Sequence, residues 1–90
     1  MPLLVVRHKV KDYAAWKKVF DGHKGAQTAA GLSNPRVYVF ADNPNETVVL
    51  FDAADIGRAK AFGASPDLKA AMERSGVTDK PDVYLLNPAP

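Results

Sequence analysis

The pattern of apolar and polar positions along the chain predicts four strands and two helical segments. Runs rich in β-branched and aromatic residues, bounded by turn-forming residues, are typical of strands. Apolar residues that recur at spacings of three and four are typical of the buried face of a helix. The predicted strands are Leu3–Val10, Arg36–Ala41, Glu46–Asp52 and Asp82–Leu86, and the helical segments run from Tyr13 to Ala30 and from Ile56 to Ser75.

Capping and turn residues support these boundaries. Asp12 and Asp55 are good N-caps for the two helical segments, and Ser65-Pro66 predicts a restart within the second one. Glycines are predicted to end both segments, because a glycine readily adopts the left-handed conformation that stops a helix. These terminators are Gly31 and Gly76, and turns are predicted at Asn34-Pro35 and Asp42–Asn45.

The order strand, helix, strand, strand, helix, strand predicts a ferredoxin-like α+β fold. Its sheet would contain four antiparallel strands, since a short turn joins the second and third strands. Residues 1–90 form one domain in this prediction. Residues 87–90 are expected to be a tail, because prolines cannot continue a strand ladder.

Every predicted strand carries apolar residues on both of its faces. In the first strand, Leu3 and Val5 alternate with Leu4 and Val6, and the other three strands show the same pattern. An antiparallel sheet with one solvated face would instead alternate apolar with polar residues. Two helices cover only one face, so we expect a second copy of the chain to cover the other in a homodimer. The alternative is that some of these residues are scattered surface positions, which monomers tolerate.

Composition and charge narrow the range of functions. The chain is 47% hydrophobic and 24% charged, which is ordinary for a globular domain. Its net charge of +2 and the absence of a clustered basic face do not favour a nucleic-acid partner. The strand from Glu46 to Phe51 also lacks the basic-aromatic signature of an RNA-recognition motif. No segment fits a targeting peptide or a membrane-spanning helix, so we expect a cytoplasmic protein without a membrane partner.

The chemistry available to the chain is limited, because it contains no cysteine. Disulfides and thiolate metal sites are therefore excluded, and two histidines without a nearby acid pair do not indicate a metal site. His8 and His23 are the candidate catalytic residues, since a neutral imidazole accepts a proton near neutral pH. They are expected to lie on adjacent elements and could converge on one cavity. The alternative is structural, with His8 at a strand end and His23 at the edge of the core.

Four further side chains are candidates for substrate binding. Trp16 belongs to a row of aromatic side chains on one face of the first helical segment. This row could form one wall of a binding site for a flat ligand, or simply pack against the sheet. Tyr38 and Tyr84 are strand residues whose hydroxyls could hydrogen-bond a phenol or carbonyl, or pack across strands or at an interface. Arg36 could bind an anion, although arginines at strand ends are commonly solvated.

Several short motifs spread over about residues 3–86 match a known pattern. They are Leu4–Val10, Asp12-Tyr13, Trp16-Lys17, Phe20-Asp21, Ala61-Phe62, Ser65–Lys69, Met72, Gly76-Val77 and Pro81–Tyr84. With these motifs the chain resembles small dimeric α+β-barrel proteins related to the antibiotic-biosynthesis monooxygenase domain, including cyclase-like members. The resemblance implies a homodimer whose sheets form a barrel, with a pocket near the junction of sheet and helices.

In enzymatic members of this family, the pocket binds a polycyclic aromatic substrate and oxygenates it without metal, flavin or haem. The resemblance therefore implies a protein without a cofactor. Haem-degrading relatives use a histidine of the second helix as an iron ligand, and the second helical segment of this chain contains no histidine.

Together these features predict a homodimeric protein that binds a small aromatic or polyketide-like molecule. It would act as a cofactor-free monooxygenase or cyclase-like enzyme. His8 or His23 would deprotonate a phenolic substrate, and Tyr38 or Tyr84 would position its oxygen. The alternative hypothesis is a non-catalytic ligand-binding or structural dimer of the same fold.

Overall fold

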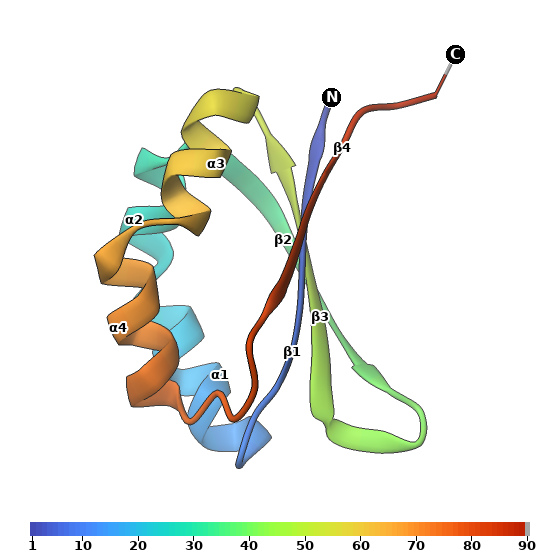
Figure 1. Cartoon of the computed structure of the whole chain (residues 1–90), viewed down its shortest axis with the longest axis vertical. Coiled ribbons are helices and arrows are strands. Elements are labelled where there is room, and N and C mark those ends of the chain that lie inside the picture. The colour runs from blue at the N-terminus through green and yellow to red at the C-terminus, as the bar shows by residue number, and fades with distance from the viewer. Residues whose placement is uncertain (90) are drawn as a thin grey trace.

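The computed structural model describes residues 1–89, and Figure 1 shows their arrangement as one helical layer against one sheet. Pro90, the last residue of the predicted tail 87–90, lies outside the described residues. The elements in chain order are β1 (Leu3–Lys9), α1 (Tyr13–Gly22), α2 (Lys24–Ala29), β2 (Leu32–Phe40), β3 (Asn43–Ala53), α3 (Ile56–Gly63), α4 (Pro66–Ser75) and β4 (Asp82–Leu86).

The four strands form one antiparallel sheet in the order β2-β3-β1-β4. This order places β1, the first strand in sequence, between β3 and β4. This strand order and the antiparallel pairing confirm the predicted α+β, ferredoxin-like fold. All four helices lie on one face of the sheet and leave the opposite face without a layer from this chain (Figure 1). None of the helices in residues 1–89 is long and apolar enough to cross a membrane.

The helix predicted from Tyr13 to Ala30 is two helices, because the chain leaves helical geometry at His23. Gly22 and Gly25 flank this position, and glycine is the weakest helix former after proline. The His23 N–H still bonds to the Phe20 carbonyl, at 3.1 Å, so the two helices follow each other closely. His23 therefore lies at the junction between α1 and α2.

The predicted caps are confirmed. The Asp12 carboxylate accepts a hydrogen bond from the Ala14 N–H at 3.3 Å, and the Asp55 carboxylate accepts one from the Gly57 N–H at 2.7 Å. The Ser65 hydroxyl caps α4 by accepting from the Leu68 N–H at 3.1 Å. The second helical segment is therefore divided at Ser65, as the sequence predicts.

The predicted turn at Asn34-Pro35 is wrong, because both residues lie inside β2. They form an irregularity between the pairs Ser33–Asp52 and Arg36–Leu50, and Asn34 adopts a φ of 50°. Asparagine visits this left-handed region more readily than most residues, so the strand can bulge here and continue.

The reversal between β2 and β3 is shorter than the predicted turn over Asp42–Asn45. Phe40 already pairs with Asn43, so only Ala41 and Asp42 remain in the turn. The Asn43 side chain accepts a hydrogen bond from the Asn45 N–H at 3.0 Å, which holds the start of β3. β3 consequently begins three residues earlier than predicted.

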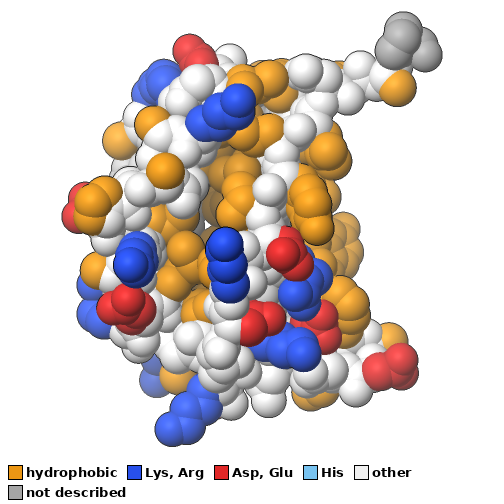
Figure 2. All heavy atoms as spheres, in the orientation of Figure 1, with side chains coloured by type: hydrophobic (Ala, Val, Ile, Leu, Met, Phe, Trp, Pro, Cys, Tyr) orange, Lys and Arg blue, Asp and Glu red, His pale blue; other side chains and the backbone are white. Residues whose placement is uncertain are grey.

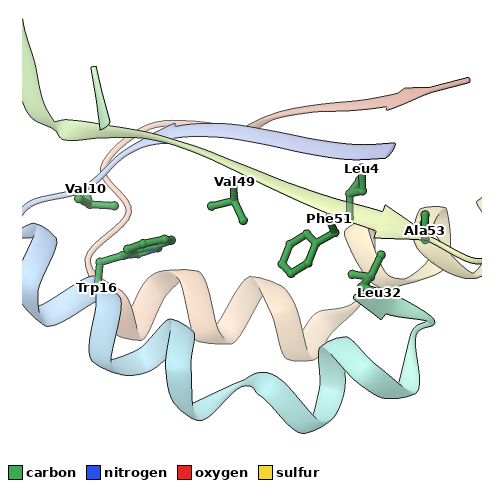
Figure 3. Close-up of a cluster of buried hydrophobic side chains, with 8 residues drawn as sticks. Leu4, Val10, Trp16, Leu32, Val49, Phe51 and Ala53 are labelled. Atoms are coloured by element: carbon green, nitrogen blue, oxygen red, sulfur yellow. The ribbon is translucent and has the colours of Figure 1, made fainter. Parts of the chain in front are cut away.

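The hydrophobic core lies between the sheet and the helices (Figure 3). Residues two apart on a strand share a face, so Leu4 on β1 and Val49 and Phe51 on β3 point toward the helices. Trp16 meets them from α1 and is almost fully buried. The buried hydrophobic cluster consists of Leu4, Val10, Trp16, Leu32, Val49, Phe51, Ala53 and Ala59.

The outer face of the sheet is the face turned away from the helices. The register places Tyr38 opposite Val48, and Tyr84 opposite Val5, on this face. Tyr38 is 60% exposed and Tyr84 is 52% exposed. The apolar residues that the alternation assigns to this face are Leu3, Val5, Tyr38, Val48, Leu50, Tyr84 and Leu86.

The glycine that ends α4 is expected to be required for stability. Gly76 has a φ of 84°, and an added Cβ would lie 3.4 Å from the Lys11 Cβ. We expect Gly76→Ala to lower the free energy of unfolding by about 1–2 kcal/mol, because the left-handed conformation disfavours a Cβ. Gly25→Ala is the matched control, since nothing lies within 4 Å and an alanine favours the helix. Chemical denaturation checks both, and equal effects would contradict the prediction.

Candidate functional site

A cavity of about 60 Å³ lies between the inner face of the sheet and the helical layer. Figure 2 shows the surface hollowed in this region, between the helices and β4. Residues from β1, β3 and β4 and from all four helices surround the space. Its lining comprises Val6, His8, Trp16, Val19, Phe20, His23, Gln27, Val49, Phe51, Phe62, Leu68, Ala71, Met72, Ser75 and Val83.

The structure brings three of the predicted site residues to this one cavity. His8 comes from β1, Trp16 from α1, and His23 from the junction of α1 and α2. The His8 and Trp16 ring centroids are 5.4 Å apart in an edge-on arrangement, and Trp16 stacks on Phe20 with a centroid distance of 5.0 Å. His23 packs against Phe62 of α3, with their ring centroids 6.0 Å apart. The two histidines therefore approach the cavity from separate layers of the fold.

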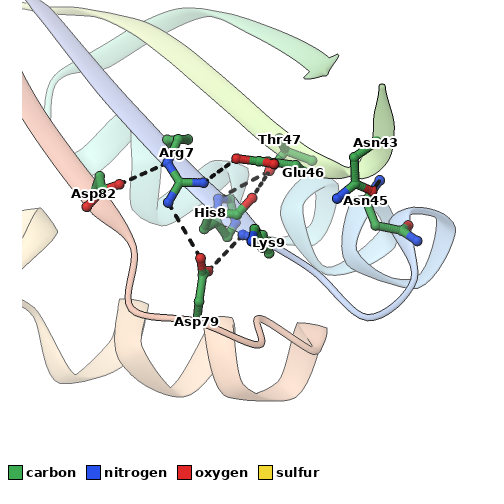
Figure 4. Close-up of polar contacts among 9 residues, drawn as sticks. All are labelled: Arg7, His8, Lys9, Asn43, Asn45, Glu46, Thr47, Asp79 and Asp82. Carbon is green, nitrogen blue, oxygen red and sulfur yellow. Dashed lines mark hydrogen bonds and ion pairs between the residues drawn. The ribbon is translucent and has the colours of Figure 1, made fainter. Parts of the chain in front are cut away.

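His8 is held by a buried polar contact with Thr47, its neighbour on β3. The Thr47 Oγ1 lies 3.2 Å from His8 Nδ1 and 3.3 Å from the His8 carbonyl oxygen (Figure 4). His8 is 3% exposed and Thr47 is fully buried. Burial lowers the pKa of His8, with a smaller opposing effect from Asp79 and a smaller further lowering from Arg7. The imidazole is therefore neutral at pH 7 and able to accept a proton.

The cavity is apolar and contains few polar groups. Among the described residues that line it, His8 and His23 are the only ionisable side chains. Gln27 and Ser75 add an amide and a hydroxyl, each of which hydrogen-bonds to a backbone carbonyl, at 3.5 Å and 2.9 Å respectively. Because no lysine or arginine faces the space, a permanently charged anion would bury its charge unpaired. This environment favours a neutral ligand.

The other predicted binding residues do not line the cavity. Tyr38, Tyr84 and Arg36 lie on the outer face of the sheet, and the Arg36 guanidinium binds the Asp52 carboxylate at 2.9 Å. In the single chain, these three side chains are separated from the two histidines by the sheet itself. Their predicted contact with substrate stays a prediction.

A cluster of charged side chains lies on the outer face around Arg7. Its guanidinium forms ion pairs with Glu46, with Asp79 at 3.5 Å and with Asp82 at 2.8 Å (Figure 4). The Asp79 carboxylate also accepts a hydrogen bond from the Lys9 N–H at 2.8 Å. Arg7 thus joins β1 to β3, to β4 and to the segment before β4. No three His, Cys, Asp or Glu side chains within residues 1–89 are arranged to hold a metal ion.

The site candidates predicted from the sequence did not include three polar residues of this region: Gln27 and Ser75, which line the cavity, and Thr47, which contacts His8 from behind it. Thr47 alternates with Val49 and Phe51, so strand periodicity alone places it on the buried face. A polar residue on such a face needs a hydrogen-bond partner, which is the signal that could have identified it. Its pairing with His8 depends on the register between β1 and β3, which is a tertiary property.

The fold defined by this sheet and its helical layer is found in structures of antibiotic biosynthesis monooxygenases and related proteins. A candidate antibiotic biosynthesis monooxygenase from Bordetella bronchiseptica aligns with a TM-score of 0.80 and 12% identity, covering 98% of this chain and 96% of that one. SnoaB from Streptomyces nogalater, a cofactor-independent oxygenase, aligns with a TM-score of 0.75 and 16% identity, covering 99% and 93%.

A further candidate monooxygenase, from Caulobacter crescentus, aligns with a TM-score of 0.74 and 20% identity over 99% of this chain and 90% of that one. No model of a known protein family matches the sequence, and no curated protein matches it significantly. The resemblance predicted from the sequence is confirmed as a shared fold. Identities this low establish the architecture and leave the activity to the residues of this chain.

The buried imidazole predicts a pH dependence of stability. The pKa of His8 is lowered in the folded state from its ordinary value of 6.5, so the unfolded chain binds more protons at mildly acidic pH. The free energy of unfolding should therefore fall as the pH falls below about 6.5. His8→Gln should remove this part of the dependence. Denaturation of both proteins between pH 7.5 and 5.5 checks this, and parallel curves would contradict it.

Proposed function

We propose that this protein binds a neutral aromatic molecule with a weakly acidic proton, and oxidises it with dioxygen without a cofactor. The observation that carries the proposal is the apolar, aromatic-walled cavity whose only ionisable side chains, among the described residues, are His8 and His23. A buried neutral imidazole beside a ligand is suited to remove a proton. The likeness to SnoaB, a cofactor-independent oxygenase, supports the reaction type at the level of the fold.

The proposed chemistry begins with proton transfer to His8 from a phenol or from an activated ring CH₂ group. The resulting anion is electron-rich and reduces dioxygen. For a ring CH₂ group, one oxygen atom becomes the new carbonyl, and the other leaves as water with the two hydrogens of the CH₂ group. For a phenol, one oxygen atom becomes the new carbonyl of a quinone, and the other leaves as water with the hydroxyl hydrogen and the hydrogen of the oxidised ring carbon. Substrate and dioxygen supply all the atoms and electrons, so the protein contributes the base, the orientation and a dry site. His23, across the cavity, is the second candidate proton acceptor.

The size of the cavity constrains how such a ligand binds. At about 60 Å³ it is smaller than the roughly 150 Å³ engineered cavity that admits benzene. An aromatic ring therefore enters only if lining side chains move. Phe62, Leu68 and Met72 are half-buried and come from α3 and α4. Methionine and leucine side chains can change rotamer, so this side of the cavity is the proposed route for the ligand.

The functional unit in this proposal is a homodimer formed through the outer face. That face carries the exposed Tyr38, Tyr84 and Leu86, together with half-buried valines and leucines of the central strands. An exposed apolar surface of this extent marks an interaction site. A second copy presents the same surface, and two-fold pairing buries the outer faces of both copies against each other. Tyr38, Tyr84 and Arg36 would then be interface residues.

Oxygen uptake tests the catalytic part of the proposal. We expect the wild-type protein to consume dioxygen with at least one member of a panel of anthrones and hydroquinones. His8→Gln should lower the rate by about 100-fold or more, as loss of a general base does.

Ala71→Phe should abolish ligand binding, because it fills the cavity. An exposed alanine of the same helix gives the matched control, Ala70→Phe, which should retain activity.

Two results would contradict this assignment. If the wild-type protein binds panel members but consumes no oxygen, the non-catalytic ligand-binding alternative is favoured. If His8→Gln retains full activity, His8 is not the base, and His23→Asn becomes the informative variant.

Sedimentation velocity tests the dimer. The wild-type protein should sediment as a dimer at low micromolar concentration. Tyr84→Lys should shift it toward monomer by at least tenfold in dissociation constant, because it places an unpaired charge among the apolar side chains of the outer face. Ala70→Lys adds the same charge on the exposed side of α4 and should leave the dimer intact. A monomeric wild-type protein would contradict the prediction.

A further inference from the structure

We propose that Thr47 is a positioning residue that fixes the proton of His8 on Nδ1 and so leaves Nε2 as the proton acceptor. This inference deepens the proposed function, since it specifies which ring nitrogen would act as the base. It rests on the buried contact between these two residues.

The geometry of the Thr47 hydroxyl favours one arrangement of protons. A threonine hydroxyl has one hydrogen to donate and lone pairs that accept. Its Oγ1 lies within hydrogen-bonding distance of two His8 atoms, Nδ1 at 3.2 Å and the carbonyl oxygen at 3.3 Å. The carbonyl oxygen can only accept, so the hydroxyl donates to it. The same Oγ1 then accepts from Nδ1–H, and both contacts become hydrogen bonds.

The opposite tautomer satisfies fewer groups. If Nδ1 carried no proton, the hydroxyl could donate to Nδ1 or to the carbonyl oxygen, but not to both. One of the two contacts would then place two acceptors against each other. Thr47 is fully buried and His8 is 3% exposed, so water cannot readily compensate for the lost bond. The arrangement with Nδ1–H is therefore favoured.

This tautomer is the one that the proposed reaction requires. With Nδ1 bonded to Thr47, Nε2 is the ring nitrogen that remains for a ligand in the cavity that His8 lines. A neutral imidazole protonated on Nδ1 has its lone pair on Nε2, and the tautomer is set by the hydrogen bond at the other nitrogen. The edge-on contact with Trp16, at 5.4 Å, further limits rotation of the ring. Thr47 thus orients the base without touching the substrate.

Nitrogen NMR of histidine-labelled protein tests this inference without any substrate. At pH 7.5, His8 in the wild-type protein should show a protonated, pyrrole-type Nδ1 and an unprotonated, pyridine-type Nε2. Thr47→Val has nearly the same shape but lacks the hydroxyl, so the proton should move to Nε2. Thr47→Ser keeps the hydroxyl and should keep the wild-type tautomer. The His23 signals serve as an internal reference in every spectrum.

The wild-type spectrum alone can overturn the proposal, even if Thr47→Val fails to fold. A pyridine-type Nδ1 in the wild-type protein would contradict it, and so would an unchanged tautomer in folded Thr47→Val. A loss of the wild-type tautomer in Thr47→Ser would show that the methyl group, and not the hydroxyl, matters.

Activity then separates this inference from the proposed function. If oxygen uptake occurs, Thr47→Val should lower it at least about tenfold, because a histidine in the wrong tautomer is a poor base. Thr47→Ser should restore most of the rate. If no panel member is oxidised, the proposed function fails, while the tautomer remains established or refuted by the spectra.

Discussion

A four-stranded sheet has two faces, and the helices of this chain cover only one of them. The rest of the structure depends on this constraint. On the covered face, alternate residues such as Leu4, Val49 and Phe51 pack against Trp16 and form the core. On the outer face, the intervening residues include Tyr38 and Tyr84, which are more than half exposed. A domain of 90 residues without disulfides has little stability to spare, so burying the second face by pairing would matter energetically.

The cavity exists because the helical layer does not fill the space above the sheet completely. Large aromatic side chains form its walls, and polar groups are limited to a few positions that the fold can satisfy. His8 is tolerated there because Thr47 from the next strand supplies a hydrogen-bond partner, and because burial keeps the imidazole neutral. On the other side of the sheet, Arg7 is surrounded by the charges of Glu46, Asp79 and Asp82. The sheet therefore separates a neutral interior from an electrostatic network that joins its central strands.

The order of the elements could be predicted from local signals, and the details that failed have local causes as well. Asp12, Asp55 and Ser65 cap helices as predicted, since a cap depends only on neighbouring residues. The expected turn at Asn34-Pro35 is instead an irregularity within β2, because pairing with β3 continues on both sides of it. Turn propensity is a local preference, and here the cross-strand hydrogen bonds override it.

For the site, the sequence by itself determined the chemical inventory: two histidines, no cysteine, and an aromatic stripe on the first helical segment. Periodicity also grouped His8 with Leu4 and Val6 on one strand face, and Trp16 with Phe20 on one helix face. Only the tertiary structure decided which residues meet. The strand register brings Thr47 to His8, and the packing of the helices on the sheet brings His23 to the same cavity. The strand register also places Tyr38, Tyr84 and Arg36 on the outer face of the sheet, away from the cavity. Register and layer packing are long-range properties, and no local pattern in the sequence specifies them.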